Sequence, residues 1–197
     1  MPDTAPPVSP ICDAPIDPAT ERAFRRYSEG AMVFHWITAV LMFATLPIAW
    51  AMVSMPRDDP ARPVWFMIHK SIGITIFAVV LLRILWRALV RPPALAGRLP
   101  AWEAWTARVN HVLLYAILIV MPVSGYIGGR APMFFGLFQL PVVTEDKAFA
   151  HAAMTVHLVT QWVVYLVIAL HLLGVVWHVA IRRDGTLERM LPRQTRA

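Results

Sequence analysis

The sequence predicts an all-α protein, an integral membrane four-helix bundle with both termini in the cytoplasm. Hydrophobic residues make up 58% of the 197-residue chain and charged residues only 15%, whereas a soluble domain carries about 25% charged residues. The apolar residues are also gathered in four long runs. A helix needs about 20 apolar residues to cross a bilayer core of about 30 Å, and each run is long enough.

The four predicted spans cover residues 31–55, 64–89, 106–128 and 148–181. Pro47 and Pro122 fall inside the first and third spans, where a bundle can tolerate the kinks that they are expected to cause. The fourth run is longer than a span requires, so one of its ends is expected to project. The apolar segment 129–147 is interrupted by Pro and Gly, and we expect it at the outer interface as a short amphipathic or re-entrant segment.

Charge sets the predicted orientation. Lys and Arg are most frequent before the first span, between the second and third, and after the fourth. The side of the membrane that is richer in these residues belongs in the cytoplasm, which predicts a multi-pass membrane protein with both termini in the cytoplasm. The net charge of +6 therefore reflects orientation in lipid rather than nucleic-acid binding. Residues 1–26 are Pro- and Asp-rich, have no apolar core and predict a disordered tail, followed by one domain over residues 27–193.

Histidine dominates the chemistry that the spans can offer. With Cys12 as the single cysteine, the chain has no CxxCH motif for c-type haem, no cysteine cluster and no intrachain disulfide. All seven histidines lie in or at the edge of a predicted span, and ionisable residues inside a bilayer are costly and usually functional. They are His35, His69, His111, His151, His157, His171 and His178.

The spacing of the histidines in the fourth span predicts two sites. His157 and His171 are 14 residues apart and His178 follows seven residues later, so the three share one helix face. At 1.5 Å per residue, His157 and His171 are separated by about 21 Å, most of the bilayer core. Helices at matching depth supply the partners, which predicts His69 for the outer site and His35 for the inner one.

Haem is the cofactor that best fits facing imidazoles in an apolar bundle, because imidazoles bind its iron. Without a CxxCH motif the haem would be b-type. Gly73 and Gly174 lie near the predicted ligands and would let a flat macrocycle approach. Zinc or copper is a competing interpretation, although such a site wants three or four converging ligands. The third interpretation is that the histidines bind no cofactor and are hydrogen-bonded to neighbouring carbonyls.

Four further residues are candidates at the inner side. Arg83 follows His69 by 14 residues and reaches the inner depth, where a haem propionate or a quinone carbonyl would supply the partner that a buried arginine needs. His178 and His111 could bond a quinone and move its proton, since histidine titrates near neutral pH; each could equally be a polar interface residue. Arg87 is one turn beyond Arg83, where snorkelling to the interface also accounts for it.

Several segments together resemble the bacterial cytochrome b561 family. They are FHW in the first span, MIHKSIG and the later Arg83 in the second, NHVLLY in the third, and HLVTQWVVYLVIALH followed by RRDGTLERMLP. The resemblance covers roughly residues 27–193 and implies a four-helix membrane protein with two b haems. At the matching positions it implies His35 with His171 on one haem and His69 with His157 on the other.

The resemblance also implies electron transport between a quinone pool and a second partner. Members similar to this chain include a superoxide oxidase, so the expected function is oxidation of superoxide and reduction of ubiquinone, as an oxidoreductase. Lys70 and Arg130 would attract superoxide at the outer side, although Asp58, Asp59, Glu145 and Asp146 share that side. The alternatives are a relay cytochrome between quinol and a periplasmic redox protein and, more remotely, a haem-free metal or proton transporter.

Overall fold

Four long helices form the fold of the computed structural model, which describes residues 26–93 and 99–192. They are α2 (Glu29–Ser54), α3 (Arg62–Leu89), α4 (Ala101–Gly128) and α5 (Lys147–Val176). A π-helical turn, η2 (Trp177–Arg182), continues α5, and a 3₁₀ turn, η3 (Glu188–Met190), follows. All four are long and apolar enough to cross a membrane, which confirms the predicted four-helix membrane architecture. The predicted tail lies outside the described residues, apart from Arg26.

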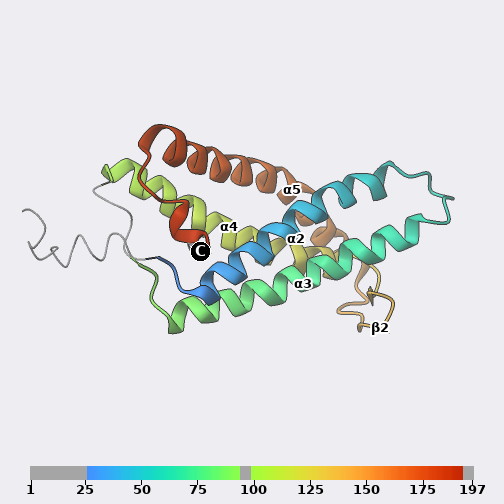
Figure 1. Cartoon of the computed structure of the whole chain (residues 1–197). Coiled ribbons are helices and arrows are strands. Elements are labelled where there is room, and N and C mark those ends of the chain that lie inside the picture. Colours follow the sequence, from blue (N-terminus) through green and yellow to red (C-terminus); the bar gives the residue numbers. More distant parts are fainter. Residues whose placement is uncertain (1–25, 94–98, 193–197) are drawn as a thin grey trace, which may run out of the picture.

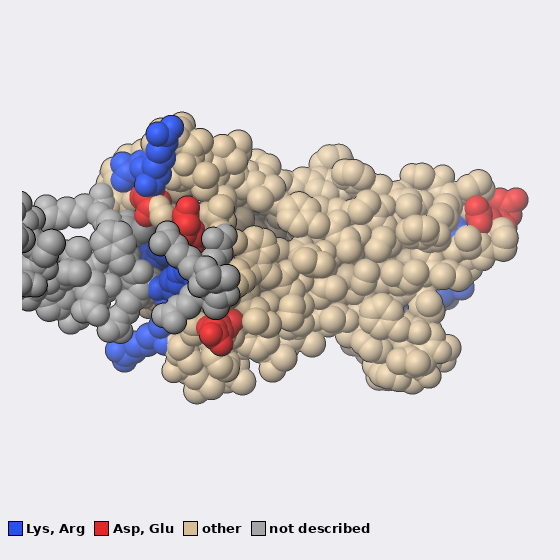
Figure 2. Space-filling view, in the orientation of Figure 1, with Lys and Arg blue, Asp and Glu red and all other residues tan. Residues whose placement is uncertain are grey.

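The helices pack in the order α2, α3, α4, α5, each contacting the next along the bundle (Figure 1). Two small apolar clusters form the interior. One contains Ile72, Ile76, Val80 and Leu118, and the other contains Ile117, Val164 and Val167. Apolar side chains also cover the outside, and in Figure 2 charged residues gather at the two ends of the bundle while the long middle carries almost none. Such a surface suits lipid rather than water.

Local sequence explains where the helices begin. The Ser28 hydroxyl accepts a hydrogen bond from the Ala31 amide at the start of α2, and Asp146 accepts from two amides of the first turn of α5. Proline occupies the first turn of α3, where its missing N–H costs nothing. Both α2 and α4 continue through the internal Pro47 and Pro122.

The segment between α4 and α5 forms a β-hairpin, and its predicted location at the outer interface stays a prediction. Strand β1 (Met133–Phe134) pairs antiparallel with β2 (Phe138–Gln139). The turn residues Phe135 and Gly136 have φ angles of 45° and 76°. Two consecutive residues with positive φ favour a tight hairpin and exclude a continuous α-helix.

Both ends of the described chain lie at the same end of the bundle, which we call the inner end; the hairpin lies toward the opposite, outer end (Figure 1). The amide of Tyr27 donates to the Arg189 carbonyl at 3.2 Å, and Nε1 of Trp36 donates to the Met190 carbonyl at 2.7 Å. The C-terminal segment therefore folds back onto the start of α2. Its cytoplasmic location stays a prediction.

Candidate functional site

The outer histidine pair consists of His69 on α3 and His157 on α5. Their ring centroids are 6.2 Å apart and the ring planes are nearly perpendicular, at 87°. Nδ1–H of His157 donates to the Met121 carbonyl at 2.8 Å, and Nδ1 of His69 lies 3.2 Å from the Thr45 hydroxyl. Both contacts fix the rings through Nδ1. Because a carbonyl can only accept, Nε2 of His157 keeps a lone pair, which is the state that a metal-binding imidazole requires. The Thr45 hydroxyl can accept from Nδ1–H of His69, so it permits the same state there.

The same two rings line a cavity of about 240 Å³ enclosed by all four helices. Most of its wall is apolar, and Lys70 and Gln161 are among its few polar side chains. Gly73 also lines it, and a Cβ atom added there would meet nothing within 4 Å. A flat apolar ligand beside the outer pair would therefore find space that no side chain fills.

Gly125 on α4 makes room for the outer pair in a different way. A Cβ atom at this position would lie 2.7 Å from Nδ1 and 2.8 Å from Cε1 of His157. Such distances are well inside van der Waals contact, so only glycine allows the imidazole to lie against α4 and reach the Met121 carbonyl. Gly125 thereby helps to orient His157.

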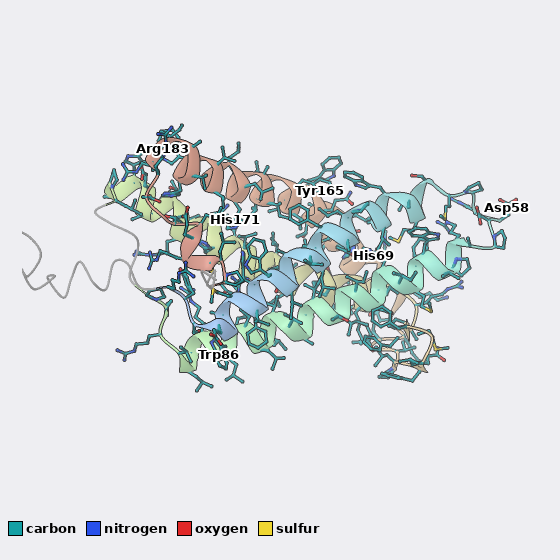
Figure 3. All side chains as sticks on the ribbon, viewed as in Figure 1. Asp58, His69, Trp86, Tyr165, His171 and Arg183 are labelled. Atoms are coloured by element: carbon teal, nitrogen blue, oxygen red, sulfur yellow. The ribbon has the colours of Figure 1, made fainter. Side chains whose placement is uncertain are left out.

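The inner group brings together three imidazoles from three helices. His35 on α2 and His171 on α5 have ring centroids 6.3 Å apart at 68°, and His111 on α4 lies 5.6 Å from His171. Figure 3 shows His171 toward the inner end and His69 toward the outer end, on the side of Asp58. The structure thus brings together both histidine pairs expected from depth, and it adds His111 to the inner group.

Arg83 reaches the inner group, as its spacing from His69 predicted. Its Nη2 donates to Nδ1 of His35 at 3.2 Å, and its guanidinium lies 5.3 Å from the centre of the Tyr115 ring. Arg87, by contrast, is exposed at the end of α3. Of the two arginines, Arg83 is the one placed to act on an inner ligand.

The spacing of the imidazoles tests whether they suit haem iron. A first-row metal binds an imidazole nitrogen at about 2.0–2.1 Å, and that nitrogen lies roughly 1.2 Å from the ring centre, so two rings on opposite sides of one metal have centroids about 6.4 Å apart. The separations of 6.2 Å and 6.3 Å fit this arrangement.

Within residues 26–93 and 99–192, no group of three or more His, Cys, Asp or Glu could hold a metal ion. Paired imidazoles without further ligands suit iron whose other positions a macrocycle fills.

His178 lies in the π-helical turn and pairs with an acid. Its Nδ1–H donates to the Asp184 carboxylate at 2.6 Å. Asp184 also accepts from the amide and the hydroxyl of Thr186, at 3.1 Å and 2.6 Å. Burial alone would raise the pKa of Asp184, but the hydrogen bonds from Thr186 and His178 outweigh it and hold that pKa below its ordinary value. Asp184 is therefore ionised at neutral pH and orients the imidazole, with Nε2 as the nitrogen that can bind a ligand.

The remaining predicted residues lie at the outer side. Nζ of Lys70 donates to the carbonyl of Arg130 at 2.8 Å, and Lys70 also lines the outer cavity. The Arg130 side chain is exposed. His151 is exposed near the start of α5.

Sequence reasoning missed five residues that orient the candidate ligands: Thr45, Tyr115, Met121, Gly125 and Asp184. Two of them carry a signal. The stretch SGYIGG, which holds Gly125, is rich in small residues, and small residues let membrane helices approach closely. RRDG, which holds Asp184, reads as a turn. Thr45, Tyr115 and Met121 carry none, because a carbonyl or a hydroxyl in an apolar run gains its role only from helix packing.

Comparison with known proteins places this architecture in a family. The family model described as prokaryotic cytochrome b561 matches residues 26–193. Two relatives from Escherichia coli (strain K12) are named cytochrome b561 homolog 2 and cytochrome b561 homolog 1. The first is 32% identical over 178 residues, covering 84% of this chain and 91% of the relative. The second is 24% identical over 173 residues, covering 86% and 98%.

A third relative, from Yersinia pestis, is named "Probable superoxide oxidase CybB". It is 28% identical over 176 residues, covering 86% of this chain and 98% of the relative. The matches extend over all four membrane helices, and the family implies b-type haem, which agrees with the spacing of the imidazole pairs. The chain belongs to the prokaryotic cytochrome b561 family, and it is a multi-pass bacterial membrane protein of electron transfer.

Proposed function

We propose that this protein holds two b haems and oxidises superoxide at its outer end while it reduces ubiquinone at its inner end. His69 and His157 would hold the outer haem, and His35 and His171 the inner one. The observation that carries the proposal is the pair of imidazole separations, 6.2 Å and 6.3 Å, at two depths of one bundle. When bound, b haem supplies reversible one-electron transfer. The proposed location is the bacterial inner membrane.

Lys70 supports superoxide as the donor. Its ammonium group follows the outer histidine His69 directly in sequence and lines the cavity that both outer imidazoles share. The Arg130 carbonyl holds the ammonium group at 2.8 Å, and the exposed Arg130 side chain adds a second positive charge. A positive charge at the mouth of a site attracts a small anion and raises its association rate. The name of the Yersinia pestis relative points to the same donor.

The inner end offers groups that can bind a quinone and handle its protons. Ionised Asp184 holds Nδ1–H of His178 at 2.6 Å, so Nε2 of His178 is free to exchange a proton with a quinone oxygen. His111 bonds the Ala107 carbonyl through Nδ1–H at 2.6 Å and keeps Nε2 available in the same way. Arg87 would contribute positive charge at this rim. We assign the quinone to this end because His178, His111 and Arg83 all lie there.

The proposed reaction balances over two electrons. Two superoxide anions each lose one electron and become dioxygen. One ubiquinone gains these two electrons and two protons and becomes ubiquinol. The protons enter at the inner end, where His178 lies.

Haem content is the first test. A pyridine haemochrome assay should give two b haems per chain, and His157→Ala and His171→Ala should each remove one, from the outer and the inner site respectively. His151→Ala is the matched control, because His151 lies on the same helix but is exposed. If His157→Ala and His171→Ala emptied the same site, the proposed pairing would be wrong. A colourless protein from haem-replete cells would instead favour a haem-free metal or proton transporter.

Stopped-flow mixing of the oxidised protein with superoxide then tests the donor. We expect rapid haem reduction and, with ubiquinone present, formation of ubiquinol. Absence of haem reduction at micromolar superoxide would favour the second candidate, a relay cytochrome between quinol and a periplasmic redox protein. That candidate rests on the two Escherichia coli relatives, which are named only as cytochrome b561 homologues.

A further inference from the structure

The β-hairpin at the outer end presents an apolar tip that the bundle does not cover. Leu137 is 76% exposed, Phe138 52%, Phe135 44% and Met133 43%. In Figure 1 the hairpin stands out from the bundle beside α3. Residues 131–144 contain no Lys, Arg, Asp or Glu. In water, such a tip would be an exposed apolar patch.

The depth of the hairpin follows from its contacts with α3. The Ser71 hydroxyl accepts from the Phe135 amide at 2.8 Å and lies 3.3 Å from the Met133 carbonyl. Helix α3 has 28 residues, so it is about 42 Å long and exceeds the bilayer core by about 12 Å, or eight residues. Even if the whole excess projected at the outer end, Ser71, nine residues after Arg62, would lie inside the core. The hairpin that it holds therefore lies at the edge of the lipid.

The backbone of the hairpin is hydrogen-bonded as a lipid environment requires. The amide of Leu137 donates to the Phe134 carbonyl and that of Leu140 to the Pro132 carbonyl, both at 2.9 Å. Ser71, with no exposed surface, accepts from the Phe135 amide at the turn. Lipid-exposed irregular backbone does not occur inside the hydrocarbon region, whose interior cannot bond polar groups. A hairpin bonded in this way therefore suits the interfacial edge of the lipid. In water, the Phe135 amide could bond to solvent and would not need the buried Ser71 hydroxyl as its partner.

We propose that this hairpin is a membrane anchor whose tip inserts into the outer leaflet and is covered by phospholipid. Helix α3, on which the hairpin rests, also exposes apolar side chains, among them Val64, Leu81 and Leu85. The anchor is joined to the outer site at two points. Ser71 bonds the turn, and the Arg130 carbonyl holds Lys70 at 2.8 Å. Lipid at the tip thus helps to hold the stretch His69–Ser71 that carries the outer imidazole.

Cysteine labelling in liposomes tests the proposal. In a Cys12→Ser background, Leu137→Cys is compared with Asp58→Cys, which lies in the exposed α2–α3 turn on the same side of the membrane (Figure 3). The haem-loaded protein is reconstituted into phosphatidylcholine–phosphatidylglycerol vesicles and treated with a membrane-impermeant maleimide. Labelling at position 137 should be about tenfold slower than at position 58, as expected if the tip leaves the lipid less than a tenth of the time.

Equal labelling rates at the two positions would overturn the proposal, because the tip would then lie in water. Slow labelling in native membranes but fast labelling in pure lipid vesicles would also overturn it, since a protein partner would then cover the tip. If the Leu137→Cys protein fails to bind haem, Phe138→Cys provides a second position on the same tip. The labelling rate is independent of electron donor and acceptor, so this test stands apart from the proposed function.

Discussion

Gly125→Ala is the smallest change that should separate the outer site from the inner one. In the structure His157 lies against Gly125, and its Nδ1–H donates to the Met121 carbonyl one turn away on the same helix. An added Cβ would lie 2.7 Å from Nδ1, whereas ordinary contact begins at 3.4 Å. The imidazole must then move by 3.4 − 2.7 = 0.7 Å. The inner imidazoles are on other turns and are not displaced.

Two opposing effects set the magnitude. Alanine is favoured over glycine inside a helix by about 1 kcal/mol, so without the clash the substitution would stabilise α4. Displacing the imidazole from its orienting carbonyl costs about 10- to 100-fold in metal affinity, which is about 1.4–2.7 kcal/mol. We therefore expect the outer haem to bind 10- to 100-fold more weakly. The stability of the haem-free protein should change little, because loss of the His157–Met121 hydrogen bond costs about 1 kcal/mol and offsets the gain in helix propensity.

Haem titration of the haem-free protein, read by visible absorbance, measures this affinity, and thermal unfolding measures stability. Gly128→Ala is the matched control on the same helix, because its Cβ would meet the Met154 backbone at 2.6 Å rather than a histidine. It should push α4 from α5 and lower thermal stability. If Gly125→Ala bound two haems with wild-type affinity, Gly125 would not orient His157, and the reasoning would be refuted.

Three further changes test other parts of the site. Lys70→Gln should slow reduction by superoxide several-fold and weaken its dependence on salt, as measured by stopped flow; an unchanged rate would exclude steering by Lys70. Because hydrogen bonds hold the pKa of Asp184 below its ordinary value of 3.8, its stabilising effect is full above that pH and is lost on acidification. Asp184→Asn should thus lower the free energy of unfolding by about 1.5 kcal/mol at neutral pH, and a difference that does not decrease as the pH falls below 3.8 would contradict this. Gly73→Ala, which meets no protein atom, should stabilise the haem-free protein by up to about 1 kcal/mol but weaken haem binding at the outer site; undiminished binding would show that haem does not fill that space.

Much of the fold could be predicted because lipid imposes simple rules. Apolar runs of this length form helices in lipid, because a helix bonds its own backbone groups. In such a helix, the 14-residue interval between His157 and His171 places the two histidines at different depths of the membrane. The start of α4 was less predictable. The helix begins at Ala101 rather than at 106, because Pro100 ends the preceding loop and the first turn buries Glu103. Arg182, from the far end of the chain, lies 3.5 Å from that carboxylate.

The orientation of His178 could not be predicted from its spacing. Seven residues after His171, an α-helix would keep His178 on the same face, but the structure changes to a π-helical turn at Trp177. A π-helix bonds i to i+5 rather than i+4, so the α-helical rotation no longer applies. His178 instead pairs with Asp184, an acid beyond the end of the helix.

The spacing of the histidines treats the inner and outer pairs as equivalent, but their hydrogen bonds differ. The outer rings meet a carbonyl and a hydroxyl at Nδ1, and both of these partners can accept a hydrogen bond from Nδ1–H. Nδ1 of His35 instead meets Arg83, whose guanidinium can only donate. That contact places the His35 proton on Nε2. If His35 held a haem through Nε2, its proton would have to move to Nδ1 and the contact with Arg83 would have to break. The Arg83 guanidinium would then be available to a propionate or a quinone oxygen, the anionic or polar partner that a buried arginine needs.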